Sequence, residues 1–366
     1  MGKPLFDKYL TYCVRCCLPE TVIGIKFDER GICNGCNSSE EKMYIDWDTR
    51  HQELKKKLAF AKEQCKDRAH NCIVPVSGGK DSFFQTYILT RKYGMTPLAV
   101  TFNHNWYTEV GKRNLQRLLE TFDVDHIMYT PKRSLVNRIA CKSIEQIGDS
   151  CWHCHAGIGA FTLQIAVKFK IPMIVWGESV AEDGCQWSYY ESTKKDIFDE
   201  KYFVKISAKQ NVESMVDNSI PLRELEFFQH PSTEEYNEAG IVGLHLGDYM
   251  FWDDERQEEF IKREFGWEED DVEGSYKRYK SVECKMIGIH DYTKFIKRGY
   301  GRTTDHAVKD VRAGIMTREE ALDIINKIDP KRPGTIDYFL KITGMSEDEF
   351  IEKIKAVRDG ASKKLP

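Results

Sequence analysis

A short polar segment, Ser-Gly-Gly-Lys-Asp-Ser at residues 77–82, joins an apolar run to a segment with helical periodicity. Residues 73–76 are typical of a short buried strand, and apolar residues recur at helical spacing over 83–93. Gly78 and Gly79 let backbone N–H groups approach an anion closely, and the following helix N-terminus adds a positive dipole end. The pattern predicts a phosphate-binding turn between a strand and a helix.

This turn is not a Walker A loop, because Asp81 follows Lys80 where a hydroxyl residue belongs, and Val74 occupies the position of the first glycine. Lys80 can neutralise phosphate oxygens, and Asp81 can ligate Mg²⁺. The segment resembles the PP-loop of the N-type ATP pyrophosphatases, which cleave ATP between the α and β phosphates and adenylate a carbonyl oxygen. The resemblance implies catalytic roles for Lys80, Asp81 and Ser82, and pyrophosphate binding by Ser77, Gly78, Gly79, Lys80, Asp81 and Ser82.

Two cysteine pairs near the N-terminus have the spacing of metal ligands. Cys13 and Cys16 form one C-x2-C knuckle, and Cys33 and Cys36 form another after sixteen intervening residues. The chain has twelve cysteines and no recognisable export signal, which favours metal binding over disulfides. We therefore predict a zinc ribbon in which Zn²⁺ binding supplies the free energy of folding. Cys17 is a spare thiol able to replace Cys16.

A further C-x2-C pair, Cys151 and Cys154, lies in the segment Ser-Cys-Trp-His-Cys-His. Three interpretations remain open. The pair can belong to a possible second metal site completed by Cys185, Cys284 or a histidine, it can handle substrate or ammonia, or it can supply structural thiols at a helix N-terminus.

The periodicity predicts an α/β fold with a doubly wound parallel sheet, of the adenine nucleotide alpha hydrolase-like type that the PP-loop implies. Expected strands cover 73–76, 97–102, 126–129 and 172–176, and expected helices cover 47–64, 83–93, 109–122, 134–147 and 156–170. Ligands bind at the carboxyl ends of such strands. We therefore expect Asn103, Gly177 and Glu178 to bind ATP; Glu178, Glu182 and Asp183 are either Mg²⁺ or substrate ligands or a solvated acidic loop.

Composition limits the function classes. The net charge of -4 gives no general attraction to nucleic acid, and no apolar run approaches the length of a membrane span. We expect a cytoplasmic protein that binds neither membrane nor nucleic acid. The acidic segment 253–273 is interpreted as a solvated helix face, and residues 277–302 are mostly basic.

The motifs suggest three parts of the chain. Residues 1–45 form a zinc-ribbon-like module, residues 46–230 form the PP-loop ATP pyrophosphatase domain, and residues 231–366 form a mainly helical substrate or partner region.

The segment "YKRYKSVECKMIGIHDYTKFIKRGYGR" at 276–302, with the cysteine-rich opening at 13–21, resembles the N-acetyl sugar amidotransferases, the WbpG- and PseA-like group. This resemblance extends from Cys13 to about Pro333. It implies conversion of a sugar acetamido group into an acetamidino group with ATP, Mg²⁺ and ammonia, in surface polysaccharide, O-antigen or nonulosonic acid biosynthesis. The implied partners are an N-acetylated sugar nucleotide and ammonia-supplying subunits similar to a glutaminase and cyclase pair.

Charged residues of the same segment are the candidate substrate contacts. Lys297, Arg298 and Arg302 can bind phosphate oxygens of the triphosphate or of the sugar nucleotide, although a basic solvated face is the simpler interpretation. His290 and Asp291 can orient the substrate or take a proton from ammonia.

Two other functions fit parts of the sequence. A PP-loop tRNA-thiolating enzyme would share the loop and the cysteine pairs, but it should carry a broad basic surface. A zinc-ribbon adaptor that binds nucleotide without turnover would not need the intact Lys80-Asp81-Ser82 segment.

Overall fold

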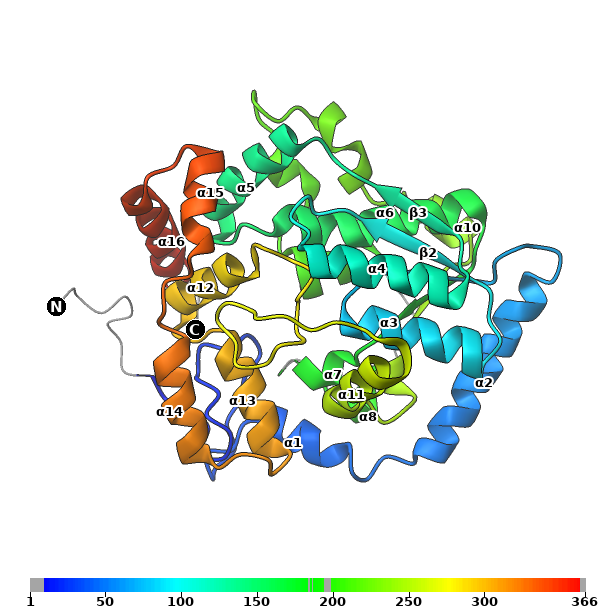
Figure 1. Ribbon diagram of the computed structural model, residues 1–366, viewed down its shortest axis with the longest axis horizontal. Coiled ribbons are helices and arrows are strands. Elements are labelled where there is room, and N and C mark those ends of the chain that lie inside the picture. The colour runs from blue at the N-terminus through cyan, green and yellow to red at the C-terminus, as the bar shows by residue number, and fades with distance from the viewer. Residues whose placement is uncertain (1–9, 184, 186, 194–198, 363–366) are drawn as a thin grey trace.

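The computed structural model describes residues 10–183, 185, 187–193 and 199–362. Its centre is a parallel sheet in the order β3-β2-β1-β4-β5, which confirms the predicted α/β doubly wound fold. The strands are β1 (Cys72–Pro75), β2 (Pro97–Phe102), β3 (His126–Tyr129), β4 (Met173–Trp176) and β5 (Val242–His245). Figure 1 shows β2 and β3 of this sheet with α4 (Glu109–Phe122) beside them. The strand order reverses between β1 and β4, where ligands of such sheets bind.

Successive side chains of each strand point to opposite faces of the sheet and pack into two apolar layers. In β1, Cys72 and Val74 enter the layer built with α2 (Trp47–Gln64), α3 (Lys80–Tyr87), α4 (Glu109–Phe122) and α11 (Asp254–Phe265). Ile73 points to the opposite layer, which is built with α5 (Arg133–Ile147), α6 (Trp152–Phe169) and α10 (Thr233–Glu238). Helices on both faces explain why the strands are almost wholly apolar.

The C-terminal helices make two further packing groups. Helices α12 (Ile287–Arg298), α15 (Thr335–Thr343) and α16 (Glu347–Ser362) pack with α5 around a third core. Helices α13 (Arg302–Arg312) and α14 (Arg318–Ile328) pack against the N-terminal cysteine segment, as Figure 1 shows at the lower left, beside α1 (Asn34–Glu41). Residues from the two ends of the chain therefore share one core.

Short helical segments complete the connections. They are η1 (Ile88–Lys92), α7 (Val180–Asp183), α8 (Tyr189–Ser192), α9 (Glu200–Phe203), η2 (Val204–Ala208), η3 (Val212–Met215), η4 (Leu222–Phe228) and η5 (Leu246–Asp248). The predicted helix 83–93 starts earlier, at Lys80, and continues as the π-helix η1. Strand β5 has no counterpart among the predicted strands, so the sheet extends beyond residue 230; the three-part division of the chain stays a prediction.

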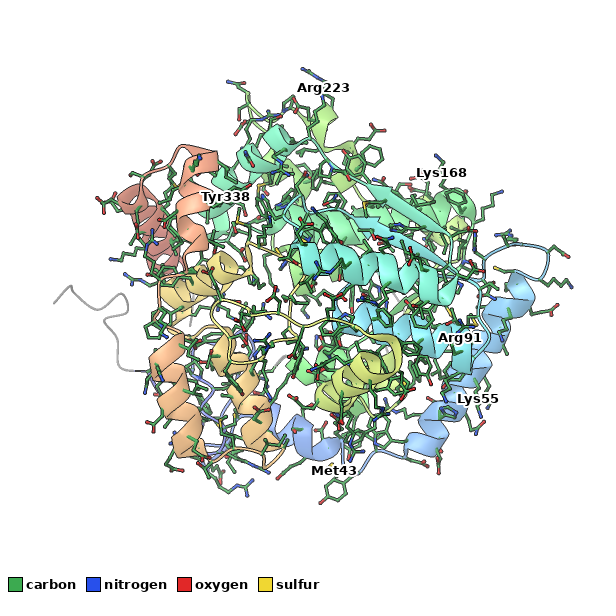
Figure 2. All side chains as sticks on the ribbon, viewed as in Figure 1. Met43, Lys55, Arg91, Lys168, Arg223 and Tyr338 are labelled. Atoms are coloured by element: carbon green, nitrogen blue, oxygen red, sulfur yellow. The ribbon has the colours of Figure 1, made fainter. Side chains whose placement is uncertain are left out.

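Charged side chains such as Lys55, Lys168 and Arg223 point outward from separate elements around the rim (Figure 2). Within the described part of the chain, no helix combines the length and apolar character needed to cross a bilayer.

The turn between β1 and α3 is held in a backbone conformation that only glycine adopts easily. Gly78 has φ +83°, and a Cβ on it would lie 2.6 Å from the carbonyl oxygen of Gly111 and 2.8 Å from the nitrogen of Leu115. Its own carbonyl accepts a 3.0 Å hydrogen bond from the Trp267 indole. The turn is therefore seated directly on the backbone of α4.

Replacing Gly78 with alanine should destabilise the fold more than the backbone angle alone explains. The left-handed conformation costs about 1–2 kcal/mol for a residue with a Cβ, and the contact with α4 adds roughly 1–3 kcal/mol of overpacking. Gly344→Ala is the matched control, because Gly344 has φ +73° with open space around its Cβ position. Urea unfolding should show the larger loss for Gly78→Ala; equal losses would show that the turn is not tightly seated.

Candidate functional site

The predicted phosphate-binding turn, residues 77–82 between β1 and α3, is ordered by its own hydrogen bonds. The Gly79 N–H donates to Ser77 Oγ at 3.2 Å, and Ser82 Oγ donates to the Gly79 carbonyl at 2.9 Å. Helix α3 begins at Lys80 without a side-chain cap from any described residue. Its first N–H groups and its positive dipole end are therefore available to an anion.

Lysines and carboxylates next to this turn form a connected network of ion pairs. The Lys80 ammonium lies 2.5 Å from Asp81 Oδ1 and 2.6 Å from Asp254 Oδ1, and its side chain is only 1% exposed. Asp254 also pairs with Lys280 at 3.0 Å and with Lys309 at 3.4 Å. Lys280 in turn pairs with Glu178.

Three of these carboxylates have the arrangement of a cation site. Oxygens of Asp81, Glu178 and Asp254 lie within 4.8 Å of one another. Burial and the neighbouring Glu178 raise the pKa of Asp81, as expected for carboxylates crowded together. Burial also opposes the charge of Asp254, but Lys280, Lys80 and Lys309 outweigh it and hold its pKa well below the usual range. This oxygen set suits Mg²⁺.

The turn and the charged cluster open into one cavity of about 560 Å³, hereafter the loop cavity. Residues from both halves of the chain line it. They include Ser77, Gly79, Lys80, Asp81, Ser82 and Glu178 from the sheet domain and Lys280, Glu283, His290, Arg302, Lys309 and Arg312 from the C-terminal region.

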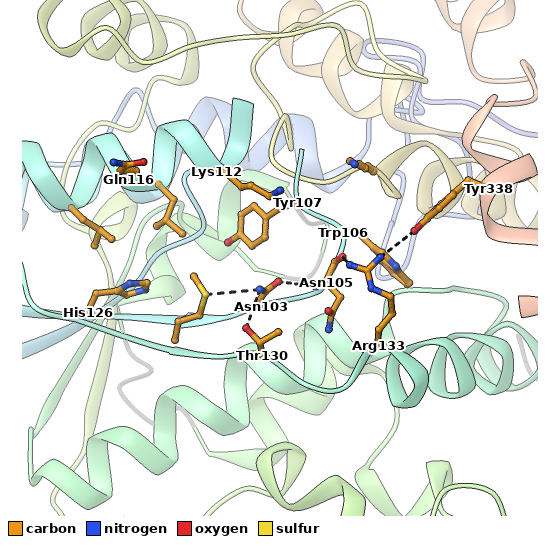
Figure 3. A pocket seen from close by; sticks show the side chains of 14 residues that line it. Asn103, Asn105, Trp106, Tyr107, Lys112, Gln116, His126, Thr130, Arg133 and Tyr338 are labelled. Atoms are coloured by element: carbon orange, nitrogen blue, oxygen red, sulfur yellow. Dashed lines mark hydrogen bonds between the residues drawn. The ribbon is translucent and has the colours of Figure 1, made fainter. Parts of the chain in front are cut away.

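The predicted ATP-binding residues are not all at this cavity. Glu178 lies in the cluster, and Gly177 lies next to it, where its carbonyl accepts a 2.9 Å hydrogen bond from Gly247 and joins the ends of β4 and β5. Asn103 instead lines a separate groove beside α4, where it donates to Thr130 Oγ1 at 3.0 Å (Figure 3). The side chains of Glu182 and Asp183 lie outside the described residues.

The predicted C-terminal contacts also divide into two groups. His290 and Arg302 line the loop cavity, and buried Asp291 accepts a 2.5 Å hydrogen bond from Arg302 Nε and so fixes that guanidinium. Lys297 donates to the Ile147 carbonyl at 2.9 Å, and Arg298 donates to the Thr21 carbonyl at 2.9 Å. These last two side chains join segments of the fold and do not line the loop cavity.

Asp149 gives His290 a defined orientation. Its carboxylate oxygens lie 3.0 and 2.9 Å from His290 Nδ1, and Oδ1 also accepts from the Cys151 N–H at 2.9 Å. Burial opposes the charge of Asp149, yet His290 and Lys297 hold its pKa far below the usual range. Asp149, Cys151 and His290 offer ligand atoms within 4.8 Å of one another, whereas Cys154 is not in that group.

A second cavity of about 470 Å³, hereafter the inner cavity, adjoins the loop cavity above the carboxyl ends of β1, β2 and β4. Both cavities are lined by Ser77, His155, Ile206, Ser281, Glu283, His290 and Arg302. Aromatic residues dominate the rest of its wall, with Cys151, Cys154 and Cys284.

Several charged residues of the site were not singled out from the sequence; they include Asp149, Asp254, Lys280, Glu283, Lys309 and Arg312. The interpretation of segment 253–273 as a solvated helix face is wrong for Asp254, which is the first residue of α11 and binds three lysines. Lys280 and Glu283 lie in the quoted signature 276–302, which was the one available signal for them.

The N-terminal cysteines gather as predicted. Cys13 and Cys36 sulfurs are 3.9 Å apart, those of Cys16 and Cys33 are 3.6 Å apart, and all four ligand atoms lie within 4.8 Å of one another. A tetrahedron with zinc–sulfur bonds of about 2.3 Å has edges of roughly 3.8 Å. The hairpin between the knuckles turns at Asp28, whose Oδ1 accepts from the N–H groups of Arg30 and Ile32.

The cysteine cluster is coupled to the loop cavity by one side chain. Arg312 lines that cavity and donates to Cys16 Sγ at 3.5 Å and to Cys33 Sγ at 3.7 Å. Cys17 turns away from the four sulfurs and donates to the Arg318 carbonyl, so Cys16 is the cluster member. The geometry of the four sulfurs fits a zinc ribbon.

Comparison with known proteins matched part of the chain to one protein family. A search of curated proteins found no match. Among solved structures, NMN synthetase from Francisella tularensis is similar, with 13% identity over 60% of this chain and 87% of that one. Its TM-score of 0.31 is too low to support a functional comparison.

Residues 273–363 match a family model described as "LPS biosynthesis protein WbpG-like, C-terminal domain". This region contributes Lys280, Glu283, His290, Arg302 and Lys309 to the loop cavity. The match confirms the resemblance predicted from the signature at 276–302: the chain carries the C-terminal domain of the WbpG-like family.

Proposed function

We propose that the protein is an ATP-dependent amidotransferase. It adenylates the acetamido oxygen of an N-acetylated, nucleotide-linked sugar, releases pyrophosphate, and replaces the oxygen with ammonia to form an acetamidino group. The observation that carries this proposal is the shared cavity: the phosphate-binding turn and the WbpG-like C-terminal region line it together.

The residues around the turn suit transfer of the adenylyl group of ATP to a carbonyl oxygen. Lys80, Ser82 and the N–H groups of α3 hold the leaving pyrophosphate, while Lys280, Lys309 and Arg302 neutralise the remaining phosphate charge. Asp81, Glu178 and Asp254 are the ligands for Mg²⁺, which supplies further charge neutralisation. The lysines already contact these carboxylates. When the phosphates of ATP bind, the lysines therefore replace carboxylate partners with phosphate oxygens.

Amination needs neutral ammonia, whereas most ammonia in water at neutral pH is ammonium. His290 lines both cavities, and Asp149 binds its Nδ1, so Nε2 is the atom left to face the cavities. His290 accepts one proton from ammonium, and the released ammonia adds to the adenylated carbon, from which AMP departs with the former acetyl oxygen. Glutaminase and cyclase-like subunits would supply the ammonia, in a cytoplasmic pathway of surface polysaccharide or amidino sugar synthesis.

The four-cysteine cluster binds zinc in this proposal. Its ligands join the N-terminal segment to α13 and α14 through the shared core, so the ion would hold the Arg312 wall of the loop cavity in place.

The tRNA-thiolation alternative is supported by the three cysteines of the inner cavity, Cys151, Cys154 and Cys284. A sulfur carrier, however, needs a thiolate. Burial raises the pKa of Cys284 to about 12 and raises the pKa values of Cys151 and Cys154 as well. Thiols of this kind are poor nucleophiles at neutral pH.

An oxygen label tests the reaction. With ATP, ammonia and a nucleotide-linked sugar carrying ¹⁸O in its acetyl carbonyl, mass spectrometry should find the label in AMP, because the adenylated oxygen leaves with phosphorus. Formation of ADP, or label retained in the sugar, would exclude the mechanism. Sulfur incorporated into tRNA would favour the thiolase.

Asp149→Asn should separate the two half-reactions. Pyrophosphate exchange that requires the acetamido sugar should stay near the wild-type rate, while the ammonia-dependent rate should fall about 100-fold or more. Hydroxylamine, which is neutral at pH 7, should restore product formation. Asp217→Asn, which removes a carboxylate paired with Lys142 away from both cavities, is the control. Equal loss of both half-reactions would show that Asp149 only supports the fold.

Zinc analysis tests the cysteine cluster. The purified chain should contain one zinc ion, and the double substitution of Cys33 and Cys36 by serine should remove it and lower solubility, because the metal supplies the folding energy of this segment. Cys65→Ser replaces another buried cysteine outside the cluster and should leave zinc unchanged. Unchanged zinc in the double variant would refute the assignment.

A further inference from the structure

Glu283 lies between the phosphate-binding turn and the inner cavity. Its backbone is fixed from the β2 side, because the Thr108 N–H donates to its carbonyl at 3.0 Å and Tyr107 forms an antiparallel bridge with Cys284. A Cβ on Gly79 would lie 3.1–3.2 Å from its carboxyl atoms. The carboxyl group is therefore packed directly against the turn.

The two carboxyl oxygens of Glu283 have different environments. Oε1 lies 3.3 Å from Ser77 Oγ, which donates to it. Oε2 is buried and has no hydrogen-bond partner among the described residues. Since Glu283 lines both cavities, this unpartnered acceptor is placed where the cavities meet.

Other buried polar atoms of the inner cavity also lack partners in the described part of the chain. They are His104 Nε2, Trp106 Nε1, Tyr107 Oη and Trp176 Nε1. Leaving such groups unsatisfied costs about 1–3 kcal/mol each, so native proteins pair them with a ligand or water. Hydroxyl and indole donors with aromatic walls suit a neutral ligand rich in oxygen atoms, and one ligand N–H would satisfy Glu283.

The chemistry of an acetamido group explains why an acceptor is needed at this position. When its carbonyl oxygen attacks the α-phosphorus, the oxygen–phosphorus bond forms and the bond to pyrophosphate breaks. The nitrogen lone pair moves into a carbon–nitrogen double bond, so the N–H becomes strongly acidic. A base near the turn must remove that proton, or the adenylated species stays cationic and reverts.

We propose that the inner cavity receives the acetamido group and that Glu283 is the catalytic base that takes the proton from its nitrogen. The inference rests on the proposed function. After ammonia adds, the protonated carboxyl returns the proton to the same nitrogen, which restores the carboxylate, and the added nitrogen loses one proton to the phosphate of AMP as AMP departs. Burial raises the pKa of Glu283, in agreement with this role.

Glu283→Gln is the main test variant, because an amide of the same shape keeps the contact with Ser77 but cannot accept the proton. Binding of α,β-methylene ATP should stay within about twofold of wild type, while acceptor-dependent pyrophosphate release should fall about 100-fold or more. Glu109→Gln makes the same change on an exposed residue of α4 and should have no effect.

A second variant separates chemistry from structure. Glu283→Ala leaves room beside the turn, so formate should restore part of its rate, whereas Glu283→Gln should not respond to formate. A rate for Glu283→Gln within tenfold of wild type, a loss of nucleotide-analogue binding, or a Glu283→Ala variant unresponsive to formate would each overturn the inference. Failure of the proposed function would differ, since the wild-type protein itself would release no pyrophosphate with acetamido sugars.

Discussion

The buried ammonium of Lys80 is the interaction on which the site depends. An unpaired charge with 1% exposure would cost several kcal/mol, so its position requires the carboxylates of Asp81 and Asp254. Asp254 begins α11, which packs on α3, and it also binds Lys280 and Lys309 from the C-terminal region. One charge in the phosphate-binding turn thereby fixes the relative positions of three distant segments.

Because Lys80 is linked through Asp254 to lysines of the C-terminal region, the sheet and its flanking helices do not form the loop cavity alone. Lys280, Glu283 and Arg302 from the C-terminal region also line it, and Asp291 accepts a hydrogen bond that fixes the Arg302 guanidinium. Arg312 extends the same wall to the sulfurs of Cys16 and Cys33. A metal bound there would act on the cavity through α13, at a distance from any reacting atom.

Sequence periodicity predicted the sheet well because β1, β2 and β4 are almost wholly buried apolar runs and α4 is amphipathic. Helices 47–64 and 109–122 were predicted to the residue, whereas β5 was missed because Gly243 and His245 interrupt its apolar run. The turn and the cysteine knuckles are local motifs, so spacing revealed them. Asp254 and Glu283 could not be found in this way, because their roles arise from contacts across about 170 to 200 residues of chain.

The two cavities have different linings, and each lining suits a different part of the proposed reaction. Phosphate binding requires several cations and a cation-binding carboxylate set, and these are concentrated in the loop cavity. The inner cavity has aromatic walls and neutral donors that lack partners among the described residues, so a second highly charged group would be poorly solvated there. Ser77 and Glu283 stand at the boundary. In the proposed reaction, an acceptor held in the inner cavity would therefore reach the α-phosphorus from that boundary, which favours attack opposite a pyrophosphate held by Lys80.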